Sequence, residues 1–351
     1  MRIAKPIREL TPYTPGEQPQ DSHVVKLNTN ENPYPPSPSI SGFLSSFDLD
    51  RLRKYPDPVF SQLRKRIADI FGTKPDMIFV GNGSDEILTL AARVFADDDE
   101  AIGAFDPSYS LYKTLAAIRN VPFVATSLPD DFGWTEPVVN HDSGAPVALF
   151  LLTNPNAPTS VRYPSEKVAA FAKSFPGVVL VDEAYADFAD GNCMPLAVSP
   201  DNENIIVMRT LSKSFSLAGL RLGYCIGPSD LIEALYKAKD SYNVDALAQS
   251  VACAALDDLP WMAANTAKVR ATRARITSEL RRRGWDVPDS QTNFLFARPA
   301  GIPAADLFEA LRSRHIYVRY FPGPRTGDRL RITIGTDKEM DELLAEIDKL
   351  A

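Results

Sequence analysis

The chain has 351 residues, of which 44% are hydrophobic and 24% charged, and its formal net charge at pH 7 is -7. A chain of this size and composition can bury one large core and a smaller one, which excludes intrinsic disorder. The acidic balance leaves no basic face for a nucleic-acid backbone, so we expect no nucleic-acid partner.

Cysteine and histidine are scarce, with three residues of each type. The cysteines lie too far apart for a disulfide framework, and the histidines lack the spacing of metal ligands, so we expect a reducing compartment and no metal. The first residues contain no apolar signal core, and the longest apolar run, residues 145–152, is too short to span a bilayer. We therefore expect a cytoplasmic protein that does not enter the membrane.

The Pro- and Asn-rich opening, to about Pro38, shows little periodic structure. Strands and helical stretches then alternate, which is the pattern of an α/β fold. Many of the strands are apolar on both faces, as parallel strands covered by helices are. We expect seven strands in this part, at Met77–Val80, Ala101–Phe105, Val121–Thr126, Val147–Thr153, Val178–Val181, Ile205–Arg209 and Arg221–Ile226.

Beyond Leu231 the pattern is helical to about Gly284, and short strands follow at 293–297, 316–320 and 330–334, with an amphipathic helix from Asp337. The predicted fold is α/β, with a large, mostly parallel seven-stranded sheet covered by helices on both faces and a smaller α+β domain. We place the large domain at residues 39–250 and the small domain at 251–351. Residues 1–38 form an N-terminal segment that joins the small domain.

A glycine turn, Gly-Asn-Gly-Ser-Asp-Glu at residues 81–86, separates the first of these strands from a helix. The first-turn amides of Ser84 and Asp85 can donate to an anion, and the helix dipole adds attraction. Serine and aspartate caps also begin many helices that bind nothing. The turn is therefore a candidate phosphate site that needs support from elsewhere in the chain.

One aspartate, Asp182, lies at the carboxyl end of the apolar strand 178–181. Ligands of open α/β sheets gather at this edge. The commoner role of such an aspartate is a helix cap. Its place one strand before an unusual lysine favours ligand binding.

That lysine is Lys213, within the run Thr-Leu-Ser-Lys-Ser-Phe-Ser-Leu-Ala-Gly-Leu-Arg at residues 210–221. A charged lysine between two core strands needs a chemical reason, although a bare Ser-x-Lys is usually a surface loop. An amine can condense with an aldehyde when its surroundings keep it partly unprotonated. The hydroxyls of Thr210 and Ser212 and the guanidinium of Arg221 suit a phosphate on the same ligand.

This segment resembles fold-type I pyridoxal-phosphate enzymes, and most closely the histidinol-phosphate aminotransferase branch of the class I and II aminotransferases. The resemblance implies pyridoxal 5'-phosphate as cofactor and Lys213 as the lysine that forms the Schiff base and moves the substrate proton. Ser212 and Arg221 would bind the cofactor phosphate, with Thr210 beside it.

The resemblance also assigns the residues around the cofactor ring. Asp182 would keep the pyridine nitrogen protonated, and so make the ring an electron sink. Tyr185 would donate to the phenolic oxygen, and Tyr109 would stack on the ring; without the resemblance, a core or surface residue would be the favoured interpretation of Tyr109. Residues 154–160 read Asn-Pro-Asn-Ala-Pro-Thr-Ser, so Ala157 replaces the asparagine that usually precedes Pro-Thr-Gly. We expect Asn156 to supply that amide, the alternative being that Tyr185 makes the contact alone.

Arginines are the expected substrate ligands, because a guanidinium grips a carboxylate with two parallel hydrogen bonds. Alternation places Arg329 and Arg331 on the same face of one predicted strand, so periodicity alone does not choose between them. The resemblance chooses Arg331, with Arg319 as a second anion site. We expect Arg329 and Arg325 to be solvated or ion-paired, and this interpretation stays open for Arg319.

Three stretches near the N-terminus, residues 10–17, 26–34 and 53–58, match the same branch. By resemblance, Tyr13 and Asn32 belong to the substrate site. Tyr55 would reach the cofactor phosphate of the neighbouring subunit, which implies a homodimer. The alternative for Tyr55 is a turn residue before a proline.

The resemblance implies transfer of an amino group between L-histidinol phosphate and 2-oxoglutarate, giving imidazole acetol phosphate and glutamate in histidine biosynthesis. The partners are then a small-molecule amino donor and a 2-oxo acid. An aromatic amino-acid aminotransferase differs only in its side-chain pocket, and a phosphothreonine decarboxylase shares the motifs, so both stay open. A cofactor-binding regulator would need a nucleic-acid module, which does not fit this acidic chain.

Overall fold

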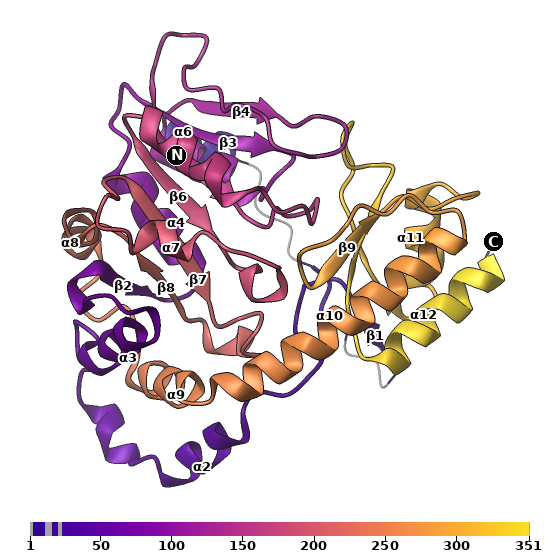
Figure 1. Cartoon of the computed structure of the whole chain (residues 1–351), viewed down its shortest axis with the longest axis horizontal. Coiled ribbons are helices and arrows are strands. Elements are labelled where there is room, and N and C mark those ends of the chain that lie inside the picture. Colours follow the sequence, from indigo (N-terminus) through magenta and orange to yellow (C-terminus); the bar gives the residue numbers. More distant parts are fainter. Residues whose placement is uncertain (1–2, 11–15, 20–22, 351) are drawn as a thin grey trace.

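The computed structural model describes residues 3–10, 16–19 and 23–350 of the chain. A large sheet flanked by helices forms one part of the molecule, and a smaller sheet with two covering helices forms the other (Figure 1). The strands are β1 (Val25–Lys26), β2 (Ile78–Gly81), β3 (Ala101–Asp106), β4 (Phe123–Ser127), β5 (Val147–Thr153), β6 (Val178–Asp182), β7 (Ile205–Thr210), β8 (Gly223–Ile226), β9 (Phe294–Ala297), β10 (Ile316–Tyr317), β11 (Arg319–Tyr320) and β12 (Leu330–Thr333). The α-helices are α1 (Lys5–Glu9), α2 (Pro38–Ser46), α3 (Ser61–Phe71), α4 (Ser84–Val94), α5 (Leu111–Arg119), α6 (Ser165–Ser174), α7 (Met194–Ala197), α8 (Ser229–Ala238), α9 (Ala246–Leu256), α10 (Leu259–Arg282), α11 (Ala304–Arg312) and α12 (Asp337–Leu350).

The large sheet has seven strands in the order β2-β8-β7-β6-β5-β3-β4. Neighbouring strands from β4 to β7 pair in parallel, and β8 pairs antiparallel with both β7 and β2. The predicted fold class, a mostly parallel seven-stranded sheet with a smaller α+β part, is confirmed. Because β3, β5, β6 and β7 run in one direction, their carboxyl ends meet along one edge, where open sheets bind ligands.

Alternate residues of the strands face two different cores, as the period of two for a strand requires. Ile78 and Val80 of β2 belong to a core with apolar residues of α3, α6 and α9. Phe79, between them, belongs to a second core with residues of α4, α5 and α8. Helices therefore cover both faces of the sheet, which explains why its strands are apolar on both sides.

The smaller part contains a three-stranded antiparallel sheet in the order β11-β12-β9. Its core contains Phe294 and Ile332 from the sheet, Leu307 from α11 and Met340 from α12. The 24-residue helix α10 runs from beside α9 to this part (Figure 1). It begins after Asp258, whose carboxylate caps the first turn by accepting from the Trp261 amide.

Three local features differ from the expectations. Arg221 does not begin β8 but lies before it in a left-handed conformation, with φ 55°. The expected strand at 316–320 is divided into β10 and β11, which belong to different sheets. The opening segment contains α1 and also β1, which pairs in parallel with β10 and so joins the smaller part.

The domain boundaries stay predictions. Across the described ranges, no helix is both long and apolar enough to cross a membrane.

Candidate active site

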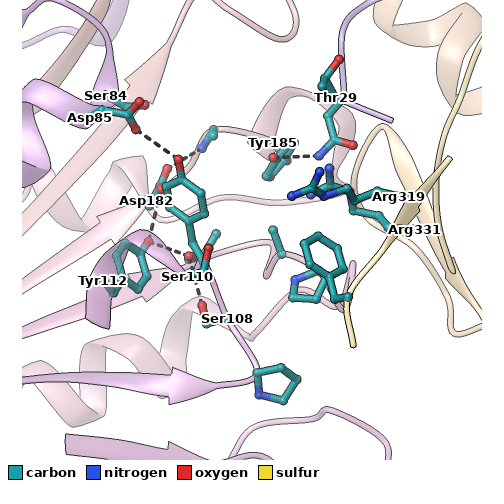
Figure 2. Close-up of a pocket in the computed structure, with 18 of the residues that line it drawn as sticks. Thr29, Ser84, Asp85, Ser108, Ser110, Tyr112, Asp182, Tyr185, Arg319 and Arg331 are labelled. Atoms are coloured by element: carbon teal, nitrogen blue, oxygen red, sulfur yellow. Dashed lines mark hydrogen bonds between the residues drawn. The ribbon is translucent and has the colours of Figure 1, made fainter. Parts of the chain in front are cut away.

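A cavity of about 570 Å³ lies between the carboxyl edge of the large sheet and the strands β11 and β12 of the small sheet. Its walls combine hydroxyl, carboxylate, ammonium and guanidinium groups with aromatic rings, and several of these are drawn in Figure 2. Most of the predicted site residues line it, namely Ser84, Asp85, Tyr109, Asp182, Tyr185, Thr210, Ser212, Lys213, Arg221, Arg319 and Arg331. Residues that are far apart in the sequence thus share one site.

Lys213 lies in the loop after β7, half-buried at the cavity wall. Its Nζ donates to the carbonyl oxygen of Thr29 at 3.2 Å. Burial and the positive charge of Arg331 lower the pKa of the amine to about 8, while the carboxylate of Glu31 acts in the opposite direction. An appreciable fraction of the amine is therefore neutral near physiological pH and able to attack a carbonyl carbon.

Asn32 supports the loop that carries Lys213 through hydrogen bonds to its backbone. Its Nδ2 donates to the carbonyl oxygens of Lys213 and Ser214, at 3.1 and 3.2 Å, and its Oδ1 accepts from the amide of Tyr34 at 3.1 Å. Asn32 does not line the cavity. The expectation of a direct substrate contact is therefore not supported, and the side chain instead holds the lysine loop against the N-terminal segment.

Asp182 is the last residue of β6 and is 5% exposed. Its Oδ1 accepts from the Ala184 amide at 3.1 Å, and its Oδ2 accepts from the Tyr112 hydroxyl at 3.2 Å. Burial raises the pKa of this carboxyl to about 7, and the charges of Asp85 and Glu183 act in the same direction. A carboxyl so poised can stabilise a positive charge on a ring nitrogen placed beside it.

A cluster of donors forms a corner of the cavity that suits an anion. Thr210 Oγ1 donates to Ser212 Oγ at 2.9 Å, and Arg221 Nη1 lies 3.5 Å from the same oxygen. The left-handed backbone of Arg221 brings its side chain against Gly83, where a Cβ atom would lie 2.8 Å from Nη2. The amides of the first turn of α4, at Ser84, complete the corner.

Two tyrosines, Tyr109 and Tyr185, supply aromatic wall to the cavity. The Tyr109 hydroxyl donates to Asp85 Oδ1 at 3.4 Å, and its ring meets that of Tyr112 edge-on at 5.7 Å. Tyr185, which Figure 2 labels, follows β6. Its hydroxyl accepts from Asn30 Nδ2 at 3.0 Å. The sequence predicted both tyrosines at the cofactor, and both line the cavity.

Asn30 is a site residue that the sequence analysis missed. It is 1% exposed, and its Oδ1 accepts from Thr333 Oγ1 at 3.0 Å while its Nδ2 reaches Tyr185. The carbonyl oxygen of Asn30 accepts from Asn293 Nδ2 at 3.0 Å. Its signal was its place within the matched stretch 26–34, but the partner that gives it a role is more than a hundred residues away.

Arg319 and Arg331 enter the cavity from the small sheet, on the same side as Tyr185 (Figure 2). They are register partners on β11 and β12, so two like charges lie directly opposite each other, which favours an anion between them. Arg331 Nη2 donates to the Asn28 carbonyl at 2.8 Å. Arg329 is 7% exposed and ion-paired with Asp286 at 2.6 Å, outside the cavity, as expected.

Arg325 also lies outside the cavity wall and donates to the carbonyl oxygens of Leu128 and Pro129, at 2.8 and 2.9 Å. Tyr55 is 80% exposed and stacks on Tyr242 with ring centroids 4.3 Å apart. Tyr55 therefore does not reach the cavity of its own chain. Tyr13 lies outside the described residues.

Asn156 does not have the expected geometry. It is fully buried, and its Nδ2 donates to the Pro107 carbonyl and to Thr159 Oγ1, both at 2.9 Å. Both amide hydrogens are thus committed to the protein, so the side chain has none for a cofactor oxygen. Ala157, which lines the cavity, has no polar side chain, and the tyrosine contact is the alternative that the geometry favours.

A model of the family described as aminotransferase class I and II matches residues 22–347. Histidinol-phosphate aminotransferase of Microcystis aeruginosa is 41% identical over 344 residues, which cover 98% of this chain and 97% of the relative. The enzyme of the same name from Geobacter sp. strain M21 is 41% identical over 345 residues, which cover 98% of this chain and 97% of that relative.

Among solved structures, histidinol-phosphate aminotransferase of Sinorhizobium meliloti in complex with pyridoxal-5'-phosphate superposes with a TM-score of 0.88 at 26% identity, covering 100% of this chain and 98% of that one. L-threonine-O-3-phosphate decarboxylase of Porphyromonas gingivalis shares the fold, with a TM-score of 0.79 at 20% identity over 92% of this chain and 98% of its own. The family expected from the lysine segment is confirmed, and this chain belongs to the class I and II aminotransferases.

Proposed function

We propose that the chain is a pyridoxal-phosphate-dependent aminotransferase that takes an amino group from L-histidinol phosphate and passes it to 2-oxoglutarate. The observation that carries this proposal is the meeting, in one cavity, of Lys213 with a lowered pKa, the buried carboxyl of Asp182 and two anion-binding sites. The names of the relatives supply the donor.

The donor groups of the cavity fit pyridoxal phosphate at each end. The corner of Thr210, Ser212 and Arg221 offers hydroxyl, guanidinium and backbone donors, which suit a phosphate. Asp182 offers a buried carboxylate, which suits a protonated pyridine nitrogen. When bound, this cofactor supplies an aldehyde for the amine and a ring that withdraws electrons from the substrate's Cα.

Lys213 has two tasks in this proposal. With the cofactor bound, Lys213 would hold it through its neutral amine, and the same amine, once free, would accept the proton from the substrate's Cα and give it back. The amine can do both because its pKa, about 8, lies close to the working pH. Asn32 holds the loop through the carbonyls of Lys213 and Ser214, and so limits where Nζ can move.

The remaining residues orient the reacting groups. Tyr185 would donate its hydroxyl hydrogen to the phenolic oxygen of the cofactor, and Asn30 fixes the direction of that hydroxyl by donating to its oxygen. Tyr109 supplies an aromatic wall. Arg331 and Arg319, opposed across two strands, can bind the carboxylates of glutamate and 2-oxoglutarate or the phosphate of histidinol phosphate.

The test is a single-turnover absorbance titration of the purified, cofactor-loaded enzyme, with no keto acid present. Histidinol phosphate, phenylalanine and phosphothreonine are added separately, and conversion of the cofactor from its aldehyde to its amine form is recorded. We expect histidinol phosphate to convert it at far lower concentration than phenylalanine. A preference for phenylalanine would indicate an aromatic aminotransferase, and CO₂ released from phosphothreonine would indicate a decarboxylase. Conversion by none of the three would refute the proposed chemistry.

Lys213→Ala provides the matched control for this titration. This variant should lose turnover but still bind the cofactor weakly, because the phosphate corner of Thr210, Ser212 and Arg221 is unchanged. Turnover close to that of the wild type in Lys213→Ala would contradict the role of the lysine.

The proposal includes a cytoplasmic homodimer in which Tyr55 reaches the cofactor phosphate of the neighbouring subunit. Its support is that Tyr55 is exposed and stacks on Tyr242, which is exposed too, and that three large apolar residues close to Tyr55 in the sequence are also exposed, namely Leu49, Leu52 and Val59. A mixing experiment tests the shared site: Lys213→Ala and Tyr55→Ala chains are unfolded together and refolded as hybrids. Since half of randomly formed dimers are hybrids with one intact site each, about a quarter of the wild-type activity should return. No recovery in hybrids shown to be dimeric would refute the shared site.

A further inference from the structure

We propose that Tyr112 and Thr153 are positioning residues that hold Asp182 as the charged carboxylate beside the ring nitrogen of the bound cofactor. The inference deepens the proposed function and rests on it, because it concerns two residues of the cavity wall that act through Asp182. Neither residue stood out in the sequence, where Tyr112 is one apolar position of a helix and Thr153 the end of a strand.

The three side chains form a short buried chain of hydrogen bonds. Thr153 and Asp182 are register partners at the ends of the adjacent parallel strands β5 and β6. Tyr112, from α5, lies between them, with its hydroxyl 2.6 Å from Thr153 Oγ1 and 3.2 Å from Asp182 Oδ2. Exposure is 1% for Tyr112, 2% for Thr153 and 5% for Asp182, so water competes little for these groups.

Neighbouring bonds set the direction of this chain. Asn156 donates both amide hydrogens, so its Oδ1 is an acceptor and takes the single hydrogen of Ser108 at 2.8 Å. Ser108 can then only accept from Thr153, over a long 3.4 Å, whereas Tyr112 is 2.6 Å from the same hydroxyl. Thr153 therefore donates to Tyr112, and Tyr112 has its own hydrogen for Asp182.

The opposite direction corresponds to a neutral Asp182. If the acid carried a proton on Oδ2, Tyr112 would accept it and donate to Thr153, and the chain would end on the long contact with Ser108. In the direction from Thr153 through Tyr112 to Asp182, each hydroxyl hydrogen has an acceptor and no hydrogen depends on the long contact with Ser108. This is the direction in which the hydrogen bonds end on the ionised carboxylate of Asp182. Because a hydrogen bond to a charged group is stronger than one to a neutral group, the network favours the ionised form.

This preference for the ionised form matters because other groups favour the neutral form of Asp182. Burial and the carboxylates of Asp85 and Glu183 raise its pKa, and the hydrogen bonds from Ala184 and Tyr112 oppose them. Of these two opposing bonds, only that of Tyr112 comes from a side chain and can be removed by substitution. A neutral Asp182 would keep its proton on oxygen and leave the ring nitrogen without one, so the ring would withdraw electrons less strongly.

The test measures the proton on the ring nitrogen directly. Enzyme is loaded with pyridoxal phosphate labelled with ¹⁵N in the ring, and the averaged ¹⁵N resonance reports the fraction protonated. In Tyr112→Phe, the balance between proton on nitrogen and proton on oxygen should shift about tenfold towards oxygen. Thr153→Val should shift it in the same direction by a smaller factor, while Thr153→Ser keeps the hydroxyl and should match the wild type.

Tyr163→Phe is the matched control. Tyr163 is also fully buried, and within the described residues its hydroxyl has no hydrogen-bond partner, so its loss should leave the ¹⁵N resonance unchanged. A Tyr112→Phe enzyme that folds, binds the cofactor and keeps the wild-type ¹⁵N resonance would overturn the inference. If Tyr112→Phe does not fold, equal ¹⁵N resonances for Thr153→Val and Thr153→Ser would overturn it instead. A wild-type enzyme that binds no pyridoxal phosphate would overturn the proposed function as well, so the two failures are distinguishable.

Discussion

Replacement of Asp182 by asparagine should stabilise the cofactor-free protein at pH 8, although it removes the charge that the proposed chemistry needs. The carboxyl titrates at about 7 in the folded protein instead of its ordinary value of 3.8, chiefly because it is buried. The folded state therefore binds this proton more tightly than the unfolded state does. Stability from this group is complete below pH 4 and is lost as the pH rises to about 7.

The size of the effect follows from the two pKa values. Each pKa unit corresponds to about 1.4 kcal/mol, so the ionised carboxyl costs the folded protein about 4 kcal/mol at pH 8. Part of this cost is already present at pH 5, and the change between pH 5 and pH 8 is about 2.5 kcal/mol. For a protein of this length, that corresponds to about 3 °C in Tm. Asparagine has no such pH dependence, and its oxygen can still accept from the Ala184 amide.

The assay is thermal unfolding of wild-type and Asp182→Asn protein after removal of the cofactor, at pH 5 and at pH 8. The difference in Tm between variant and wild type should grow by about 3 °C in favour of the variant from the lower to the higher pH. Asp130→Asn, at an exposed position, controls for the loss of a surface charge. The same difference at both pH values, or a less stable Asp182→Asn at pH 8, would refute the reasoning.

Three other substitutions or conditions test the rest of the site. The rate at which cofactor-free enzyme binds pyridoxal phosphate should rise about tenfold per pH unit up to about pH 8 and then level off, since only neutral Lys213 reacts. A rate that does not change with pH in stopped-flow absorbance would contradict this. Glu183→Gln should lower the unfolding free energy by about 2 kcal/mol in denaturant titrations, because buried Glu183 shares Arg209 with Asp187, each at 2.9 Å, and one of these two charged contacts is lost; an unchanged midpoint would count against it. Arg331→Lys should raise the KM for 2-oxoglutarate about tenfold, and more than Arg319→Lys does, because it loses two-point binding; equal KM values would exclude Arg331 as the main carboxylate ligand.

Local sequence pattern was sufficient for the architecture of the large sheet. Val147–Thr153 forms β5 with the predicted bounds, and most of the other predicted strands begin or end within two residues of the observed ones. Apolar runs between turn residues are a local property, so they can be recognised without knowledge of their partners. The strand order could not be read in this way, because it depends on which strands pair.

The same distinction applies to the site. Lys213, Asp182 and the glycine turn at Ser84 stood out because each combines a reactive or donor group with a strand end, and all three line one cavity. Arg331 and Arg329 could not be separated by alternation, and the fold separated them by giving Arg329 a buried partner, Asp286.

Hydrogen-bond partners were the part of the site that the sequence did not reveal. Asn156 was expected to be a cofactor ligand but donates its two hydrogens to the Pro107 carbonyl and to Thr159, and Asn32 supports the Lys213 loop and does not line the cavity. Asn30 was marked only by its place in the matched stretch 26–34, and Tyr112 carried no signal, yet they contact Tyr185 and Asp182. A side chain's type and local pattern set what it can donate or accept, but which group it meets depends on segments that only folding brings together.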